Sequence, residues 1–533
     1  MECMRTVGSL LAALLVARQG AAQRGGIDVK NYWFSVTIPD SGSTIQGWTG
    51  LHFERAPEDT VLALNLVGMT VDSVWNLYRQ NGRISKQFAY DGHVLRVPLP
   101  PTRDSGIDIS IWYHGSPQDG LIIGRNARGR RVAFADNWPE RARFWLPTVD
   151  HPSDKAIARF WIKVPAGWRV VANGAPRADT SRYSWDEWHP IPTYTMVIGA
   201  GEFTVSKHRP VINGRDTIPI EVWTYPEDSA FADSVPFRRA TEIVEVMQRL
   251  IAPFPYEKLA HVQSSTKFGG MENSSAIFYA EKPYVERKMR EGVVRHETAH
   301  QWFGDAVTER DWPDIWLSEG FATYFDGVIG AALDGDSVLA NAMRANAEAY
   351  FKSDVTDRPI VDSGYAADPI KLLNANSYPK GAWVLHMLRG VVGDSAFFRG
   401  LRAYYQTYRD SNATSEDFEH AMERASHTDL GWFFQQWLHQ PGYPQLEVSW
   451  RYDAGAHRVV VGITQHQKPE WGVFRLPAVM LEFHGPAGAV ARRTVAITGR
   501  ESSLSVTVPF APAEILVDPD GKLLLQTTAT GRR

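Results

Sequence analysis

The stretch from residue 293 to residue 325 constrains this chain more than any other, because it combines paired histidines with suitably spaced glutamates. It contains His296-Glu297-Thr298-Ala299-His300 and, after eighteen further residues, Glu319. In a helix, the two histidines lie one turn apart on the same face. Two imidazoles so placed can bind one metal ion, and the intervening glutamate can reach a water bound to that ion.

Glu319 can supply the third ligand that a hydrolytic zinc site needs. Such a site takes three protein ligands and leaves a fourth position open, and two histidines with one glutamate form one such set. An amphipathic helix with two surface histidines is the alternative. Glu319 argues against it, because residues 316–325 form an aromatic helical pattern in which a bare carboxylate is costly to bury. The pattern therefore predicts one zinc ion held by both histidines and Glu319.

Length and composition describe a packed protein of several domains. A chain of 533 residues exceeds what one hydrophobic core supports, so two to four domains are expected. Apolar residues make up 44% and aromatic residues 12%, which is typical of globular rather than disordered proteins. The net charge of −4 provides no basic surface for nucleic acid or for a membrane, so we expect neither as a partner.

The N-terminus resembles an export signal that covers residues 1–22. Arg5 precedes an apolar run over 7–17, and Gly20-Ala21-Ala22 offers a small-residue cleavage site. An ordinary N-terminal helix is the alternative. No segment is long and apolar enough to span a bilayer, so we predict a periplasmic or secreted protein with no integral membrane segment after signal removal. The only cysteine, Cys3, lies in this signal, so the mature chain is expected to contain no disulfide.

Hydrophobic periodicity divides the rest of the chain into three segments. Alternation typical of strands dominates residues 26–208 and predicts a largely antiparallel N-terminal β domain. Helical spacing dominates 209–440. Alternation returns over 441–526 and predicts a small β-sandwich, and the tail after Thr527 is expected to fray. The predicted fold class is therefore α+β with several domains.

Some individual elements are specific enough to predict. Two strands and two helices stand out, over residues 71–75, 94–99, 237–250 and 415–425. Thr414 or Ser415 can cap the last of these helices. The pair Gly269-Gly270 suits an edge strand whose backbone approaches another group closely, and a simple loop is the alternative.

Four motifs that occur in one order point to a family. They are Gly-Gly-Met-Glu-Asn at 269–273, HETAHQWFGD at 296–305, WLSEGFATYF at 316–325 and YPKG at 378–381. Together they resemble the M1 zinc aminopeptidases, the family of aminopeptidase N and leukotriene hydrolase. The resemblance covers nearly the whole mature chain. It implies an N-terminal antiparallel β domain, a thermolysin-like helical catalytic domain over 209–440 and a C-terminal β-sandwich.

The resemblance also implies a role for each candidate residue. Glu297 would be the general base, Glu272 would hold the free α-amine of a peptide substrate, and Tyr378 would donate a hydrogen bond to the oxyanion. One Zn²⁺ per chain would be bound by His296, His300 and Glu319. The rest of the substrate-binding motif would be Gly269, Gly270, Met271 and Asn273. These roles describe a metalloaminopeptidase that hydrolyses the N-terminal residue from oligopeptides.

Four features depart from the family pattern. Gly270 replaces a usual alanine and opens little room. Ser274-Ser275 replaces a frequent tryptophan-glycine, which we expect to alter the side-chain pocket. Asp136 aligns with a glutamine, and a second anion there would help to hold the amine. The sequence stops after the third β domain, so we expect no large C-terminal helical domain and a more open cleft.

Other functions stay open on these patterns alone. The same zinc machinery serves endopeptidases and epoxide hydrolases, although Glu272 argues against cleavage inside a peptide, which has no ammonium there. A catalytically silent peptide-binding scaffold would be favoured by loss of a ligand or of the base, and none is lost. The preferred N-terminal residue and the oligomeric state are not specified by the sequence.

Overall fold

The computed structural model describes residues 26–76, 83–85, 87–99, 106–178 and 182–532. The export signal predicted over residues 1–22 lies outside this range and remains a prediction. Within the described part, the chain forms two compact units. The first holds the residues up to Ser318 together with Leu401–Phe418, and the second holds Glu319–Gly400 and the chain from Glu419 onwards.

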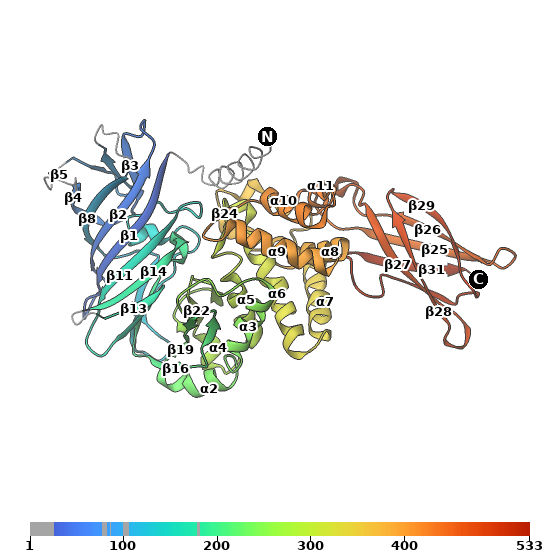
Figure 1. The fold of residues 1–533 in the computed structure, drawn as a ribbon, viewed down its shortest axis with the longest axis horizontal. Coiled ribbons are helices and arrows are strands. Elements are labelled where there is room, and N and C mark those ends of the chain that lie inside the picture. The colour runs from blue at the N-terminus through green and yellow to red at the C-terminus, as the bar shows by residue number, and fades with distance from the viewer. Residues whose placement is uncertain (1–25, 77–82, 86, 100–105, 179–181, 533) are drawn as a thin grey trace, which may run out of the picture. The chain divides into compact units, whose positions relative to one another are not determined.

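A large, mostly antiparallel sheet organises the N-terminal part of the first unit (Figure 1). In its strand β1, Tyr32, Phe34 and Val36 are buried while the residues between them are half-exposed. This period-two burial is expected of a sheet with one covered face. In sheet order, the strands are β13 (Ala175–Arg177), β14 (Tyr183–Pro192), β11 (Lys155–Lys163), β1 (Ile27–Thr37), β2 (Ile45–Arg55), β8 (Gly106–Gly115), β4 (Thr70–Asn76) and β5 (Arg83–Ser85).

Two smaller sheets complete this β region. One has the order β12 (Arg169–Ala172), β15 (Ile198–Gly201), β10 (Arg131–Ala135) and β9 (Leu121–Arg125). The other has the order β3 (Val61–Asn65), β7 (Val94–Pro98) and β6 (Ala89–Tyr90). The strands predicted over 71–75 and 94–99 are confirmed as β4 and β7, since both alternate apolar and polar residues as a half-buried strand must.

A five-stranded sheet carries the segment that leads to the candidate site. Among the described strands, the edge strand β21 pairs with β22 alone, through Gly270↔Tyr279 and Met271↔Phe278. The edge strand predicted at Gly269-Gly270 is therefore confirmed, although it begins at Gly270 and ends at Met271. In sheet order, the strands are β16 (Thr204–Lys207), β19 (Ile220–Thr224), β20 (Leu259–Ser264), β22 (Ala276–Ala280) and β21 (Gly270–Met271).

Helices dominate from Ser229 to His439, as predicted from the spacing. They are α2 (Ser229–Ser234), α3 (Ala240–Leu250), α4 (Lys282–Val285), α5 (Glu291–His300), α6 (Trp316–Asp334), α7 (Ser337–Phe351), α8 (Gly381–Val392), α9 (Asp394–Tyr408), α10 (Ser415–Ser426) and α11 (Gly431–Phe434). One short strand pair precedes these helices, β17 (Val211–Asn213) with β18 (Asp216–Ile218). A second pair lies among them, β23 (Val307–Glu309) with β24 (Ser411–Ala413). Among the described residues, no helix is both long and apolar enough to span a membrane.

The predicted cap of α10 is confirmed at Thr414. Its hydroxyl accepts a hydrogen bond from the backbone N–H of Asp417 (3.2 Å), and the Asp417 carboxylate accepts one from the backbone N–H of Thr414 (2.9 Å). This reciprocal pair satisfies two backbone donors that the first helical turn leaves without a helical partner. A cap of this kind typically stabilises a helix by about 1 kcal/mol.

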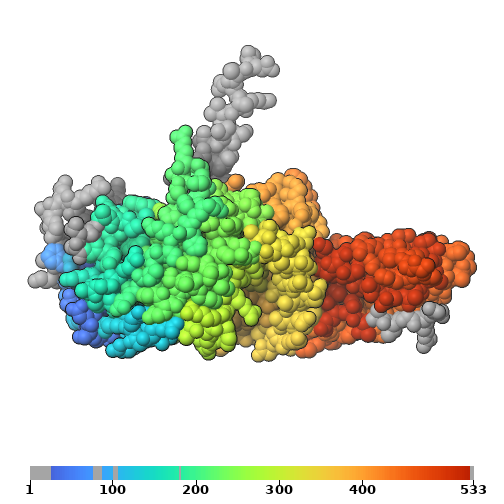
Figure 2. Space-filling view, turned by 90° about the horizontal axis from the view of Figure 1, so that it is seen from below, coloured from blue at the N-terminus to red at the C-terminus, as the bar shows by residue number. Residues whose placement is uncertain are grey.

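The C-terminal part of the second unit forms two sheets. The first has the order β29 (Glu501–Thr507), β26 (Arg458–Gln465), β25 (Gln445–Asp453) and β31 (Gln526–Arg532), and the second has the order β28 (Val490–Ile497), β27 (Leu476–His484) and β30 (Glu514–Val517). In Figure 2 these strands, coloured red, form a lobe that adjoins the yellow and orange helices of the same unit. The prediction that the tail frays after Thr527 is wrong, because β31 pairs in parallel with β25 along its whole length.

Candidate functional site

The two motif histidines lie in α5 with their Nε2 atoms close together and their ring planes nearly perpendicular, at 80°. Nε2 of His296 is 3.2 Å from Nε2 of His300, and the ring centroids are 4.8 Å apart. The spacing of four residues produces this arrangement, since it places both side chains on one helix face. The start of α5 is held by Arg239, whose Nε donates to the Glu291 carboxylate at 2.8 Å.

The far side of the His300 ring is fixed by groups that do not belong to the predicted site. Nδ1 of His300 lies 2.9 Å from Oγ of Ser318 and 3.3 Å from the carbonyl oxygen of Phe303. A carbonyl oxygen can only accept a hydrogen bond, so this geometry favours the tautomer with hydrogen on Nδ1. That tautomer leaves the lone pair of Nε2 directed towards His296.

The distance between the two Nε2 atoms fits a shared zinc ion. With Zn–N bonds of about 2.0–2.1 Å, tetrahedral geometry separates two ligand nitrogens by about 3.3 Å. Glu319 follows Ser318 in the first turn of α6, so the helix whose serine contacts His300 also carries this carboxylate. One ligand atom each from His296, His300 and Glu319 lie within 4.8 Å of one another. Two imidazoles and one carboxylate are donors that zinc prefers.

Two more carboxylates, Glu272 and Glu297, lie beside the histidine pair. With His300 they form a second group whose ligand atoms lie within 4.8 Å of one another. Glu272 is 5% exposed and Glu297 is 6% exposed. Anions buried this close together repel each other unless cations neutralise them. Ionised carboxylates in these positions would attract a cation.

The glycine-rich motif contacts the HExxH glutamate directly. A Cβ atom on Gly270 would lie 2.0 Å from Oε1 of Glu297, so the edge strand can approach this carboxylate only because residue 270 has no side chain. The small space beside Gly270 is thus filled by Glu297. Gly269 is exposed and faces open space, whereas Met271 and Asn273 are buried.

Ser274 and Ser275 form a hydrogen-bonded junction and not a pocket wall. Both are fully buried. The backbone oxygen of Ser274 accepts from Nδ2 of Asn173 at 2.6 Å, and Oγ of Ser275 donates to Glu187 at 3.1 Å. Ser275 has φ of 62°, a left-handed conformation that glycine adopts most easily. Their effect on a substrate pocket stays a prediction.

Asp136 has protein partners of its own. Its carboxylate accepts from Nη2 of Arg141 at 2.6 Å and from the backbone N–H of Lys267 at 3.3 Å. Arg141 also donates to Asp119 at 2.8 Å. The pairing with Arg141 and the bond from Lys267 anchor the chain just before the glycine-rich motif, and the role of Asp136 towards an amine stays a prediction.

Tyr378 lies in a π-helical turn, Asn376–Lys380, that leads into α8. This turn packs against α6 through two glycines. A Cβ atom on Gly320 would lie 2.9 Å from Cα of Gly381, and 3.2 Å from the backbone oxygen of Ser377. The close approach of these two backbones brings the segment of Tyr378 beside the first turn of α6, which carries Glu319. Tyr378 itself is half-buried.

Sequence reasoning did not single out two residues of the site, Ser318 and Gln301. Ser318 contacts the imidazole of His300, and Gln301 bonds to the backbone of Glu272. Each directly adjoins a predicted metal ligand in the sequence, and that adjacency is the one signal that could have found them. Asp305 lies next to Gln301, and burial, followed by the charge of Glu272, raises the pKa of its carboxyl well above the usual value.

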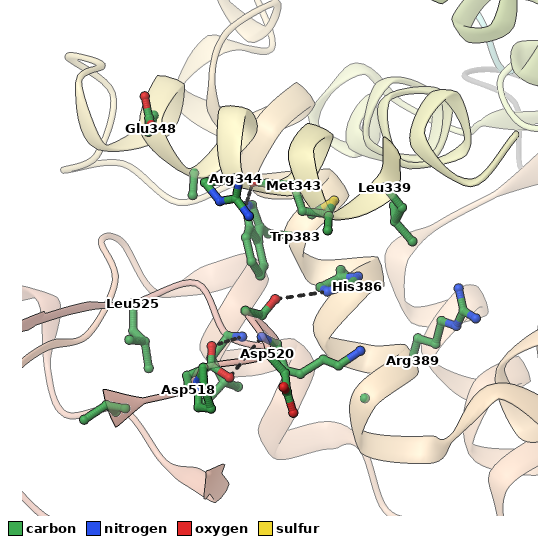
Figure 3. A pocket seen from close by; sticks show the side chains of 18 of the residues that line it. Leu339, Met343, Arg344, Glu348, Trp383, His386, Arg389, Asp518, Asp520 and Leu525 are labelled. Atoms are coloured by element: carbon green, nitrogen blue, oxygen red, sulfur yellow. Dashed lines mark hydrogen bonds between the residues drawn. The ribbon is translucent and has the colours of Figure 1, made fainter. Parts of the chain in front are cut away.

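The second unit contains a separate cavity of about 810 Å³. Figure 3 shows Met343 and Arg344 reaching into it from α7, Trp383 and His386 from α8, and Asp518 from the segment after β30. None of the described residues that line it belongs to the His and Glu groups that could hold a metal ion. We therefore assign the candidate site to α5, β21 and the start of α6.

The part of the chain that carries the candidate site resembles known peptidases. The model of the peptidase family M1 domain matches residues 237–437. Over 326 residues the chain is 32% identical to probable aminopeptidase 2 of Sulfurisphaera tokodaii, a match that covers 58% of this chain and 41% of the relative. Over 449 residues it is 28% identical to leucyl aminopeptidase of Saccharolobus solfataricus, covering 79% of this chain and 55% of the relative. The chain thus spans about half the length of these relatives.

A solved structure shows a similar fold. The M1 zinc metallopeptidase from Deinococcus radiodurans superposes with a TM-score of 0.68 at 25% sequence identity. The match covers 79% of this chain and 95% of the other. The mixed α and β architecture is therefore that of an M1 peptidase.

Replacing Ser318 with alanine should weaken zinc binding, because the His300 ring loses a partner that orients it. Loss of such a partner typically lowers metal affinity by about 10- to 100-fold. Competition with a chromophoric chelator measures the zinc Kd. Ser264→Ala, which removes another fully buried serine hydroxyl, should leave that Kd unchanged. An unchanged Kd in Ser318→Ala would show that the hydroxyl has no role in metal binding.

Proposed function

Because the chain belongs to the M1 peptidase family, we propose that it is a zinc-dependent aminopeptidase that removes the N-terminal residue from oligopeptides. The observation that carries the proposal is the pair of motif imidazoles, whose Nε2 atoms are 3.2 Å apart. The buried carboxylates of Glu272 and Glu297 lie beside this pair. The names of the relatives, aminopeptidases and a zinc metallopeptidase, support the same reaction class.

The proposed metal ligands are His296, His300 and Glu319. When bound, zinc would polarise the substrate carbonyl and lower the pKa of a coordinated water from about 16 towards 7. The buried carboxylates of Glu272 and Glu297 lie beside these ligands, where an ammonium of the substrate would be attracted to them.

Glu297 is proposed as the general base. Its carboxylate adjoins both the histidine pair and the edge strand, which holds it through contact with Gly270. From this position it takes a proton from the attacking water. The same carboxyl then delivers the proton to the amine that leaves when the peptide bond breaks.

Glu272 is proposed to bind the ammonium of the substrate. A carboxylate that pairs with an ammonium forms a charge-assisted hydrogen bond, which is about twice as strong as a neutral one. An internal segment of a peptide has no ammonium to offer, and burying Glu272 against it would leave the anion uncompensated. This difference would restrict cleavage to the first peptide bond.

Tyr378 is proposed to donate its phenol hydrogen to the oxygen of the scissile carbonyl as negative charge develops there. The packing of Gly320 against Gly381 supports this role, because it holds the tyrosine segment beside the helix of Glu319. Donors aimed at a developing oxyanion act mainly in the transition state.

Glu297→Gln should retain stoichiometric zinc and lose turnover by about 10²- to 10⁴-fold, the usual contribution of a positioned base. Elemental analysis measures the zinc, and hydrolysis of aminoacyl anilides measures the rate. Glu286→Gln, at an exposed glutamate of the same unit, should behave as the wild type. Substantial turnover in Glu297→Gln would exclude this residue as the base.

A peptide with a free N-terminus should be cleaved far faster than its N-acetylated form, because only the free form carries the ammonium. Mass spectrometry of the products from both peptides measures the difference. Equal cleavage of the two would identify an endopeptidase. If the zinc-loaded chain cleaves neither peptide, a catalytically silent peptide-binding scaffold would be favoured. Epoxide hydrolysis without peptide cleavage would identify an epoxide hydrolase.

Tyr378→Phe should lower kcat by about 100-fold with little change in KM, because its hydrogen bond would form chiefly in the transition state. Steady-state kinetics with one aminoacyl anilide separates the two constants. A large rise in KM with kcat unchanged would instead make Tyr378 a substrate-binding residue.

A further inference from the structure

Gln301 follows the second motif histidine and its side chain is completely buried. Its amide makes three hydrogen bonds. Nε2 donates to the backbone oxygen of Glu272 at 2.6 Å and to the carboxylate of Asp305 at 2.8 Å, and Oε1 accepts from the backbone N–H of Ser275 at 2.8 Å. Both donor hydrogens of the amide are therefore used, along with one acceptor position.

The ladder pairing of the glycine-rich strand ends just before Glu272, and the sheet bonds this turn again at Ser275, whose backbone oxygen accepts from the N–H of Ala260 at 3.0 Å. Strand β21 consists only of Gly270 and Met271, and its pairing with β22 ends at Met271. From Glu272 onwards, the chain turns away from the ladder. Its next bonds come from side chains, with Gln301 on one side and Asn173 on the other, where Asn173 donates to the oxygen of Ser274.

Gln301 holds this turn at two points. It binds the carbonyl of Glu272 and the N–H of Ser275, three residues further on. Both ends of the turn are therefore hydrogen-bonded to the same side chain. Within the turn, the N–H of Ala276 also donates to the oxygen of Asn273 at 2.9 Å. Because Gln301 is the residue after His300, one side chain joins the backbone that carries Glu272 directly to the end of the helix that carries the histidines.

We propose that Gln301 is a positioning residue that sets the place of the Glu272 carboxylate relative to the histidine pair, and thereby sets the preference for a free N-terminal amine. This inference rests on the proposed role of Glu272 in binding the ammonium. Ion pairs of this kind lose strength quickly as the groups move apart, and misplacement by about 1 Å in an active site can cost about 100-fold. Gln301 touches neither the substrate nor the metal in this account.

The test compares two inhibitors that bind zinc in the same way. An amino acid hydroxamate carries the ammonium, and its des-amino analogue lacks it. The ratio of their Kd values, measured by calorimetry on the zinc-loaded chain, reports recognition of the amine alone. In Gln301→Met, which keeps the length of the side chain but makes no amide hydrogen bonds, we expect this ratio to fall by about 10-fold or more. Zinc content should stay stoichiometric.

Gln263→Met is the matched control. Gln263 is also a fully buried glutamine of the first unit, its Oε1 accepts from the backbone N–H of Tyr225 at 3.0 Å, and its Nε2 donates to Asp228 at 2.9 Å. This variant should lose similar hydrogen bonds and similar stability while keeping the wild-type ratio. Glu272→Gln gives the ratio expected when recognition of the charge is lost. If Gln301→Met does not fold, Gln301→Asn replaces it, because its shorter amide cannot reach both ends of the turn.

Each result separates the two proposals. A wild-type ratio in the Gln301 variants, including an equal loss of affinity for both inhibitors, would overturn the positioning role and leave the aminopeptidase proposal intact. A wild-type protein that binds both inhibitors equally would overturn the role of Glu272 itself, and the positioning role with it. A reduced ratio in the Gln263 control as well would show that general destabilisation is the cause, and would also overturn the inference.

Discussion

The burial of several carboxylates around two adjacent imidazoles is the constraint on which the rest of this structure depends. Glu272, Glu297 and Glu319 are each about 5% exposed, and in water their mutual repulsion would be small. Inside the protein the repulsion between ionised carboxylates is larger, and a bound cation would reduce it. Under the proposed function, a metal ion and a substrate ammonium would bind beside these carboxylates.

Close approach of backbones brings these groups together. Gly270 lets an edge strand lie against the Glu297 carboxylate, and Gly320 meets Gly381 where the tyrosine segment packs on α6. A methyl group at either contact would overlap its neighbour, so both motifs contain glycine for a packing reason.

The residues next to the metal-ligand candidates provide their support. Successive helix residues are rotated by about 100°, so a residue adjacent to a ligand faces a different neighbour. Ser318, just before Glu319, reaches the outer nitrogen of His300, and Gln301, just after His300, reaches the turn of Glu272. Each ligand-bearing helix therefore also carries the group that fixes another part of the site.

The sequence by itself determined the features that depend on neighbouring residues. The spacing of His296 and His300, the alternation of the strands, the Thr414 cap and the edge strand at the glycine pair all follow from local backbone geometry. Tertiary structure alone decided the pairing of Asp136 with Arg141 and the burial of Ser274 and Ser275. It also decided the pairing of the C-terminal tail as β31 and the hydrogen bond from Gln301 to the backbone of Glu272. These contacts join segments whose approach is set by the packing of the whole unit, and no local pattern of residues encodes that approach.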